Sequence, residues 1–297
     1  MFGFPPGFLE GLGAAASLGT ADFTSRYNSA RFGSFVAVFF AITLGSLPFL
    51  IFHEWGHMTE WSSSAVLFSI LAGVLNPISL WLLFRAIAVG PVAVVSPIIA
   101  ANPALVVVIN GLWGYIPSFV QSFGLMAIFA GVLLASGVYQ GVRVLYQQNI
   151  APKTIWLATF ASILFAIRLI FIEFSVADMP VMDSFIISRC ASALICIAVV
   201  LSFSDMRRHV LKATQVGTWP LLILHATLEA CGVFLIFWGT MGEGKTLLPV
   251  VFSTITLFTL LWARLFLKEK IPPKRLVGVA FVVFGVAVLA AAPLLSP

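Results

Sequence analysis

The sequence predicts an all-α integral membrane protein with ten transmembrane helices, arranged as two inverted five-helix repeats. Three observations carry this prediction: the composition, the length of the apolar runs, and a pattern that recurs in both halves of the chain. Of the 297 residues, 61% are hydrophobic and only 9% are charged, and the mean hydropathy is +1.09. Such values lie far outside the range of water-soluble globular domains, so this class is excluded.

Ten apolar runs follow one another along the chain. A helix needs about 20 apolar residues to cross the hydrocarbon core, and most of these runs have about that length. In the first half they cover residues 8–25, 33–52, 64–88, 92–113 and 118–138. In the second half they cover residues 154–174, 184–203, 218–239, 247–266 and 275–291.

The last three runs repeat features of the first half. Aligning Phe237 with Phe84 pairs FLIFW with WLLFR. Two glycines seven residues apart also match, Gly124 and Gly131 in the first half and Gly278 and Gly285 in the second. The polar stretch Gly141–Lys153 is the natural connection between the halves. We therefore expect a first repeat over residues 1–143, a linker over 144–153 and a second repeat over 154–297.

Five spans in each half force the second copy to insert upside down relative to the first. In many transporters this inversion places the substrate site at the interface of the two repeats. Lys and Arg indicate the orientation, because these residues are enriched in cytoplasmic loops. By this topology thirteen of the 16 lie on one face, and this predicts that both termini lie outside the cytoplasm.

One segment carries a family resemblance. The sequence LFLKEKIPPKRLVG, from Leu265 to Gly278, continues into GVAFVVFGVAVL. This pattern resembles the end of EamA-type carriers of the drug/metabolite transporter superfamily. The first half holds a weaker copy, with Tyr115 where the second has Glu269. The resemblance implies a carrier in the cell (inner) membrane that exports amino acids or related metabolites, with a proton or by exchange.

Polar residues at mid-membrane depth are costly, so they usually face a cavity or a partner. His225 and Glu229 are four residues apart and share a helix face. The Phe84–Phe237 alignment pairs Glu229 with Asn76, and we expect these two side chains to meet near the centre. Glu229 is then either a coupling group that exchanges a proton or binds a cation, or a carboxylate tied to His225 or Asn76. For His225, a relay and a core position both stay open, and Asn76 is alternatively a cap for the kink at Pro77.

Asp22 and Arg168 occupy equivalent places late in the first helix of each half. Inverted insertion predicts that they form gating charges at the two ends of the pathway. Asp22 alternatively pairs with Arg26 at i,i+4.

The fourth run contains Pro91, Pro97 and Pro103, and each interior proline removes a helix hydrogen bond. We therefore expect this segment to be bent or broken, with Ser96 and Asn102 near a cavity. Trp81 is expected close to the same cavity, where its ring would contact an aromatic or cationic ligand.

The sequence His53-Glu54-Trp55-Gly56-His57 matches HExxH and gives an alternative function, an intramembrane zinc metalloprotease. Two histidines at i and i+4 bind zinc, and the glutamate acts as the base. A third ligand is needed, and no aspartate in the chain begins an Asp-Gly pair. The motif also falls in a short polar connection, which favours a solvated external hairpin.

Other classes of partner are not indicated. The stretch from Gly239 to Thr246 matches GxxxxGKT, but a spanning helix precedes it, whereas a phosphate-binding loop follows a strand. The net charge is +5, yet the basic residues form no stripe, so nucleic acid is not expected. The sequence predicts no cofactor. The expected partners are a small-molecule solute and the lipid bilayer, and a homodimer stays open.

Overall fold

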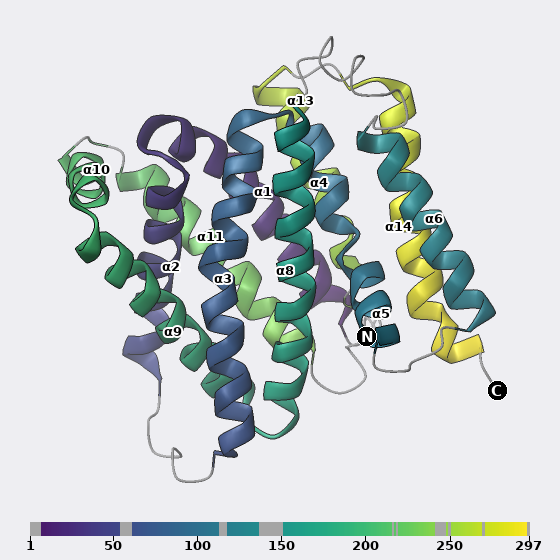
Figure 1. Ribbon diagram of the computed structural model, residues 1–297, viewed down its shortest axis with the longest axis horizontal. Coiled ribbons are helices and arrows are strands. Elements are labelled where there is room, and N and C mark those ends of the chain that lie inside the picture. The colour runs from purple at the N-terminus through teal and green to yellow at the C-terminus, as the bar shows by residue number, and fades with distance from the viewer. Residues whose placement is uncertain are drawn as a thin grey trace, which may run out of the picture.

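The computed structural model describes residues 7–53, 61–112, 118–136, 151–215, 217, 219–240, 248, 251–268 and 271–295. Within these ranges all regular secondary structure is helical (Figure 1). Helices satisfy every backbone hydrogen bond within one segment, as the interior of a bilayer requires. This confirms the all-α class.

Six helices of the first half lie within the described ranges. They are α1 (Phe8–Phe32), α2 (Ser34–Phe52), α3 (Ser63–Val89), α4 (Val92–Ala100), α5 (Asn102–Leu112) and α6 (Phe119–Ser136). The predicted run 92–113 is divided into α4 and α5 at Ala101, close to Pro97 and Pro103. The expected break in this segment is therefore confirmed. It coincides with Pro103, whose missing N–H removes the helix hydrogen bond to the Ile99 carbonyl across Ala101.

The second half contains α8 (Pro152–Ala177), α9 (Val181–Ser202), α10 (Ser204–Gln215), α11 (Trp219–Gly239), α13 (Ile255–Phe266) and α14 (Pro273–Leu295). Residues 204–215, which lie between two of the predicted apolar runs, form the amphipathic helix α10. Val210 and Ala213 on this helix pack against a cluster that includes Phe32 and Phe40. Burial of this narrow apolar face stabilises a helix that is otherwise polar.

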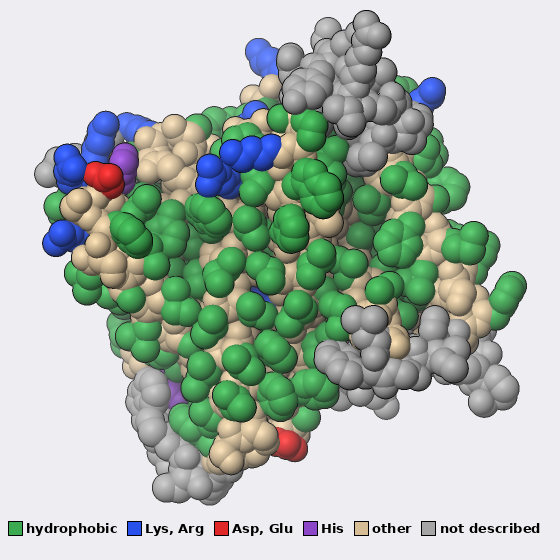
Figure 2. All heavy atoms as spheres, in the orientation of Figure 1, with side chains coloured by type: hydrophobic (Ala, Val, Ile, Leu, Met, Phe, Trp, Pro, Cys, Tyr) green, Lys and Arg blue, Asp and Glu red, His purple; other side chains and the backbone are tan. Residues whose placement is uncertain are grey.

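In the part of the chain that the structure describes, five helices have the length and hydropathy to cross a membrane: α2, α3, α8, α9 and α11. Shorter apolar helices, α6 and α13, accompany them among the described residues. Figure 2 shows hydrophobic side chains covering the middle of the visible face, as expected where lipid surrounds the protein. The chain is a multi-pass membrane protein, and the count of ten spans stays a prediction.

Helices of the two halves pack against each other in matching pairs. α6 contacts α14, α3 contacts α8, α1 contacts α11, and α4 contacts α13. The glycines aligned in the sequence meet at the α6–α14 contact, which lies along one edge of Figure 1. A Cβ on Gly131 would lie 2.7 Å from the Gly278 oxygen, and one on Gly124 would lie 2.9 Å from the Gly285 oxygen. The order of the pairs shows that α6 and α14 run antiparallel.

Most of the Lys and Arg side chains visible in Figure 2 lie toward the upper end of the bundle and around α10. Arg168 and Arg189 are buried. In Figure 1, α1 begins and α14 ends toward the lower side. The predicted topology, with most Lys and Arg on the face opposite the termini, stays a prediction.

Candidate functional site

A cavity of about 60 Å³ lies where helices from both halves converge. Its polar lining comes from five different helices, through Asp22 of α1, Asn76 of α3, Asn102 of α5, Arg168 of α8 and Glu229 of α11. Each of these side chains is less than 8% exposed. Four of them, all but Asn102, were predicted as site residues.

The rest of the wall is apolar, with Leu80, Leu83, Phe165 and Val233 among its members. The volume suits a few water molecules, since one water needs roughly 10–15 Å³ measured in this way. Pockets for small organic ligands are commonly about 300–1,000 Å³. The cavity as it stands in this structure is therefore too small for an organic solute.

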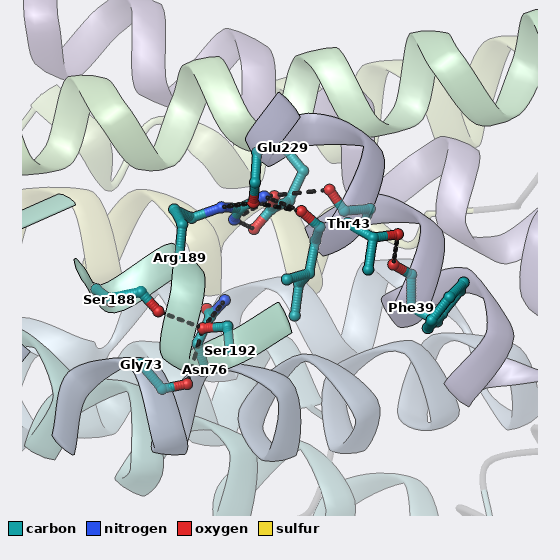
Figure 3. Close-up of polar contacts among 11 residues, drawn as sticks. Phe39, Thr43, Gly73, Asn76, Ser188, Arg189, Ser192 and Glu229 are labelled. Carbon is teal, nitrogen blue, oxygen red and sulfur yellow. Dashed lines mark hydrogen bonds and ion pairs between the residues drawn. The ribbon is translucent and has the colours of Figure 1, made fainter. Parts of the chain in front are cut away.

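Glu229 forms a buried ion pair with Arg189 of α9 (Figure 3). The Arg189 Nη1 donates to Oε2 at 2.7 Å and to Oε1 at 2.9 Å, and both side chains are 1% exposed. The expected partners of Glu229 were His225 and Asn76. The guanidinium takes their place because it offers several donors to one carboxylate.

Arg189 also connects α9 to α2. Its Nε donates to Ser46 Oγ at 3.1 Å, and its Nη2 donates to the carbonyls of Ala41 and Ile42 at 3.1 and 3.2 Å. Gly45 makes room for this contact, because a Cβ there would lie 2.6 Å from the Ala226 oxygen on α11. The arginine thus holds α2, α9 and α11 together around one charge pair.

Asn76 turns to a different residue of α9. Its Nδ2 donates to Ser192 Oγ at 3.5 Å, and Ser192 itself donates to the carbonyl of Gly73 at 2.7 Å. Figure 3 shows Asn76 and Ser192 beside each other, below the Arg189–Glu229 pair. The Asn76 Oδ1 has no hydrogen-bond partner among the described residues. Asn76 and Glu229 therefore line one cavity, as expected, but each contacts α9 separately.

Asp22 and Arg168 line the same cavity. They were predicted to lie at opposite ends of a pathway, and that arrangement is not what the structure shows. The Arg168 side chain is buried, and its Nε and Nη2 have no hydrogen-bond partner among the described residues. Among the described residues no ion pair joins Asp22 to Arg26, the predicted alternative, and Arg26 Nη1 donates to the carbonyls of Ile87 and Gly90.

The break between α4 and α5 is tied to α8 at the edge of the cavity. Ser162 Oγ lies 2.9 Å from the carbonyl of Ile98 and 2.6 Å from Asn102 Oδ1. Both acceptors flank Ala101, where the helix is interrupted. The interruption thus brings the Asn102 side chain to the cavity wall, in agreement with the expectation from the prolines.

Three predicted residues do not line this cavity. His225 is fully buried, with Nδ1 2.9 Å from Thr24 Oγ1, while Ser96 Oγ lies 2.6 Å from Thr259 Oγ1. Trp81 lines a separate hollow of about 280 Å³ beside the start of α2, and the guanidinium of Arg85 lies 5.2 Å from its ring centroid.

The HExxH motif is described only at its first residue. His53 Nε2 lies 3.3 Å from Asp183 Oδ1, and the other Asp183 oxygen accepts a hydrogen bond from Trp61 Nε1 at 2.7 Å. These contacts tie the end of α2 to the start of α9. Glu54 and His57 lie outside the described residues, and so does most of the GxxxxGKT stretch. Within the described ranges no three His, Cys, Asp or Glu side chains cluster as metal ligands do.

The sequence analysis did not assign a role to Arg189. A signal was present, because a charged residue in a span needs a partner, and Glu229 is the carboxylate deepest in a neighbouring run. The geometry that selects Arg189 rather than Asn76 depends on the close approach of α2, α9 and α11, which no local pattern encodes.

The comparisons with known proteins agree with this architecture. A model of the EamA-like transporter family matches residues 5–137 and, a second time, residues 152–291. The chain belongs to the EamA-like transporter family. The two matches correspond closely to the two halves recognised in the sequence, and membership identifies the chain as a membrane transporter of the drug/metabolite type.

The fold of this EamA-like chain also resembles that of a solved structure described only as "Crystal structure of protein". The TM-score is 0.62 at 16% sequence identity, over 98% of this chain and 99% of that one. At this identity the likeness concerns the fold alone. No curated protein matches the chain in sequence.

Proposed function

We propose that this protein is a secondary carrier that moves small organic metabolites, amino acids or related solutes, out of the cell by alternating access. Transport would draw on a proton gradient or on exchange for a second solute. The observation that carries the proposal is the central cavity, where five buried polar side chains converge from helices of both halves. Polar groups this deep in a membrane protein mark the path of a solute or ion.

The packing supports two inverted repeats around this cavity. The antiparallel α6–α14 contact joins glycines that align in the two halves, and α1–α11 and α3–α8 are likewise corresponding pairs. A rocking motion of one half against the other would open the cavity alternately to the two sides. By the charge distribution, the basic end of the bundle faces the cytoplasm and both termini lie outside.

The test is flux through vesicles that contain the purified full chain. Vesicles that contain the wild-type protein are loaded with a labelled mixture of metabolites. They are compared with equally loaded vesicles that contain no protein and with equally loaded vesicles that contain Glu229→Gln. We expect the wild type to move at least one metabolite, and Glu229→Gln to lose this flux or its response to a proton gradient while it still inserts. The matched control is Glu173→Gln, an identical change at an exposed position of α8, which should leave flux unchanged.

Absence of flux for every metabolite, from protein that elutes as a folded species, would refute the carrier. Wild-type flux and wild-type pH response in Glu229→Gln would refute the role of Glu229 alone.

A further inference from the structure

Arg168 is a buried cation with an open hydrogen-bonding edge. Its residue is 3% exposed, it lines the central cavity, and neither Nε nor Nη2 has a hydrogen-bond partner among the described residues. A buried charge without partners is strongly unfavourable. A guanidinium that is unpaired in such a place is expected to bind its anionic partner in only part of the transport cycle.

The two open nitrogens lie along the same edge of the guanidinium plane. Two parallel N–H groups on one edge are the arrangement that binds a carboxylate through both of its oxygens. The carboxylate of Glu229 is already held by Arg189 at 2.7 and 2.9 Å. No ion pair links Arg168 to Asp22 in the part of the chain that the structure describes. Neither carboxylate of the cavity wall therefore bonds to this edge of Arg168 among the described residues, which leaves the edge open to an anion from outside the chain.

We infer that Arg168 is the specificity-determining residue of the carrier and binds the carboxylate of the transported solute through Nε and Nη2. This inference rests on the proposed function. The apolar wall formed by Leu80, Leu83 and Phe165 then receives the hydrocarbon part of the solute. The carboxylate belongs either to a simple organic acid or to an amino acid. In the second case the Asp22 carboxylate on α1 accepts a hydrogen bond from the ammonium group of the solute.

The experiment measures binding and flux with matched compounds on the full chain. The probes are L-leucine, leucinamide, 3-methylbutylamine and 4-methylpentanoate, together with the corresponding phenylalanine set. Binding is read from the ligand-induced shift of thermal unfolding, and transport from competition with the solute that moves in vesicles. Any further solute that is transported in the vesicle experiment is compared with the carboxamide made from it.

We expect the carboxylates to bind and the carboxamides to bind on the order of 10- to 100-fold more weakly, the range for loss of hydrogen bonds to a charged group. Arg168→Gln should abolish this difference, and Arg168→Lys should retain part of it, because an ammonium is a point charge without the fork. Arg207→Gln, an exposed charge loss on α10, should preserve the full difference. Unfolding of each variant without ligand shows whether it folds.

The amine group separates the two sources of carboxylate. Equal binding of leucine and 4-methylpentanoate indicates a simple acid, whereas a preference for leucine that Asp22→Asn removes indicates an amino acid. Equal affinity for carboxylate and carboxamide in the wild type, or undiminished discrimination in folded Arg168→Gln, overturns the inference and leaves the carrier standing. If carboxylates bind in a way that depends on Arg168 but no solute is transported, the proposed carrier function is wrong and the carboxylate site at Arg168 is supported.

Discussion

Removing one partner of the buried Arg189–Glu229 pair should destabilise the helix contacts around the cavity. Both side chains are 1% exposed, so solvent does not screen their attraction. Glu229→Gln keeps the shape of the side chain and leaves the Arg189 charge buried without a counter-charge. Removal of one partner from a buried pair costs about 3–5 kcal/mol. We expect a loss of that size in the free energy of unfolding.

The chain contains a matched control on its surface. Arg208 and Asp205 form an ion pair of the same length, 2.7 Å, but their side chains are 77% and 73% exposed. Exposed pairs contribute about 0–1 kcal/mol, so Asp205→Asn should cost no more than that. The same chemical change thus separates the effect of burial from the effect of the contact.

The assay is unfolding of the purified protein by SDS titration in bicelles, followed by tryptophan fluorescence. The double variant Glu229→Gln/Arg189→Met removes both charges and should be more stable than the sum of the single losses predicts, by about 0.5–3 kcal/mol. Additive single losses, or equal losses in Glu229→Gln and Asp205→Asn, would refute the reasoning.

Three further predictions concern packing, the helix break and metal. Gly131→Ala should lower the free energy of unfolding by about 1–3 kcal/mol, because its Cβ would meet the Gly278 oxygen at 2.7 Å. Gly111→Ala, with open space around the added Cβ, should leave it unchanged. Unfolding of both variants checks this, and equal effects would contradict it. Ser162→Ala should cost about 1 kcal/mol, because it removes the one hydroxyl proton shared by two acceptors at the α4–α5 break. The same assay measures this, and an unchanged unfolding free energy would count against it. Purified protein should contain no stoichiometric zinc by elemental analysis. Stoichiometric zinc that is lost in His53→Ala would support the alternative function, a zinc metalloprotease.

The helical class, the apolar runs and the broken fourth segment were predictable from sequence. Each depends on a local property, such as the length of an apolar run or the missing N–H of Pro97 and Pro103. Helix α10 was not predicted, because its stability comes from contacts of Val210 and Ala213 with distant residues. Amphipathic helices of this kind have too few apolar residues to be found by hydropathy.

The candidate site was predictable in part. The cost of burying polar groups selected Asp22, Asn76, Arg168 and Glu229, and all four line one cavity. Their partners were not predictable, because the contact of Arg189 with Glu229 depends on how closely α9 approaches α11 and α2. Trp81 lines a separate hollow outside the cavity. This was not predictable either, because its position along α3 did not reveal which neighbouring helix its side chain faces.

The central claim is that the cavity opens in turn to the two sides of the membrane. The most direct measurement uses Leu80→Cys in a chain whose Cys190, Cys196 and Cys231 are replaced by Ala, labelled with a membrane-impermeant maleimide added to one side at a time. Phe160→Cys on the exposed face of α8 is the control. The account predicts labelling of Leu80→Cys from either side and of Phe160→Cys from neither. Labelling of Leu80→Cys from one side only, whatever solute is present, would contradict it.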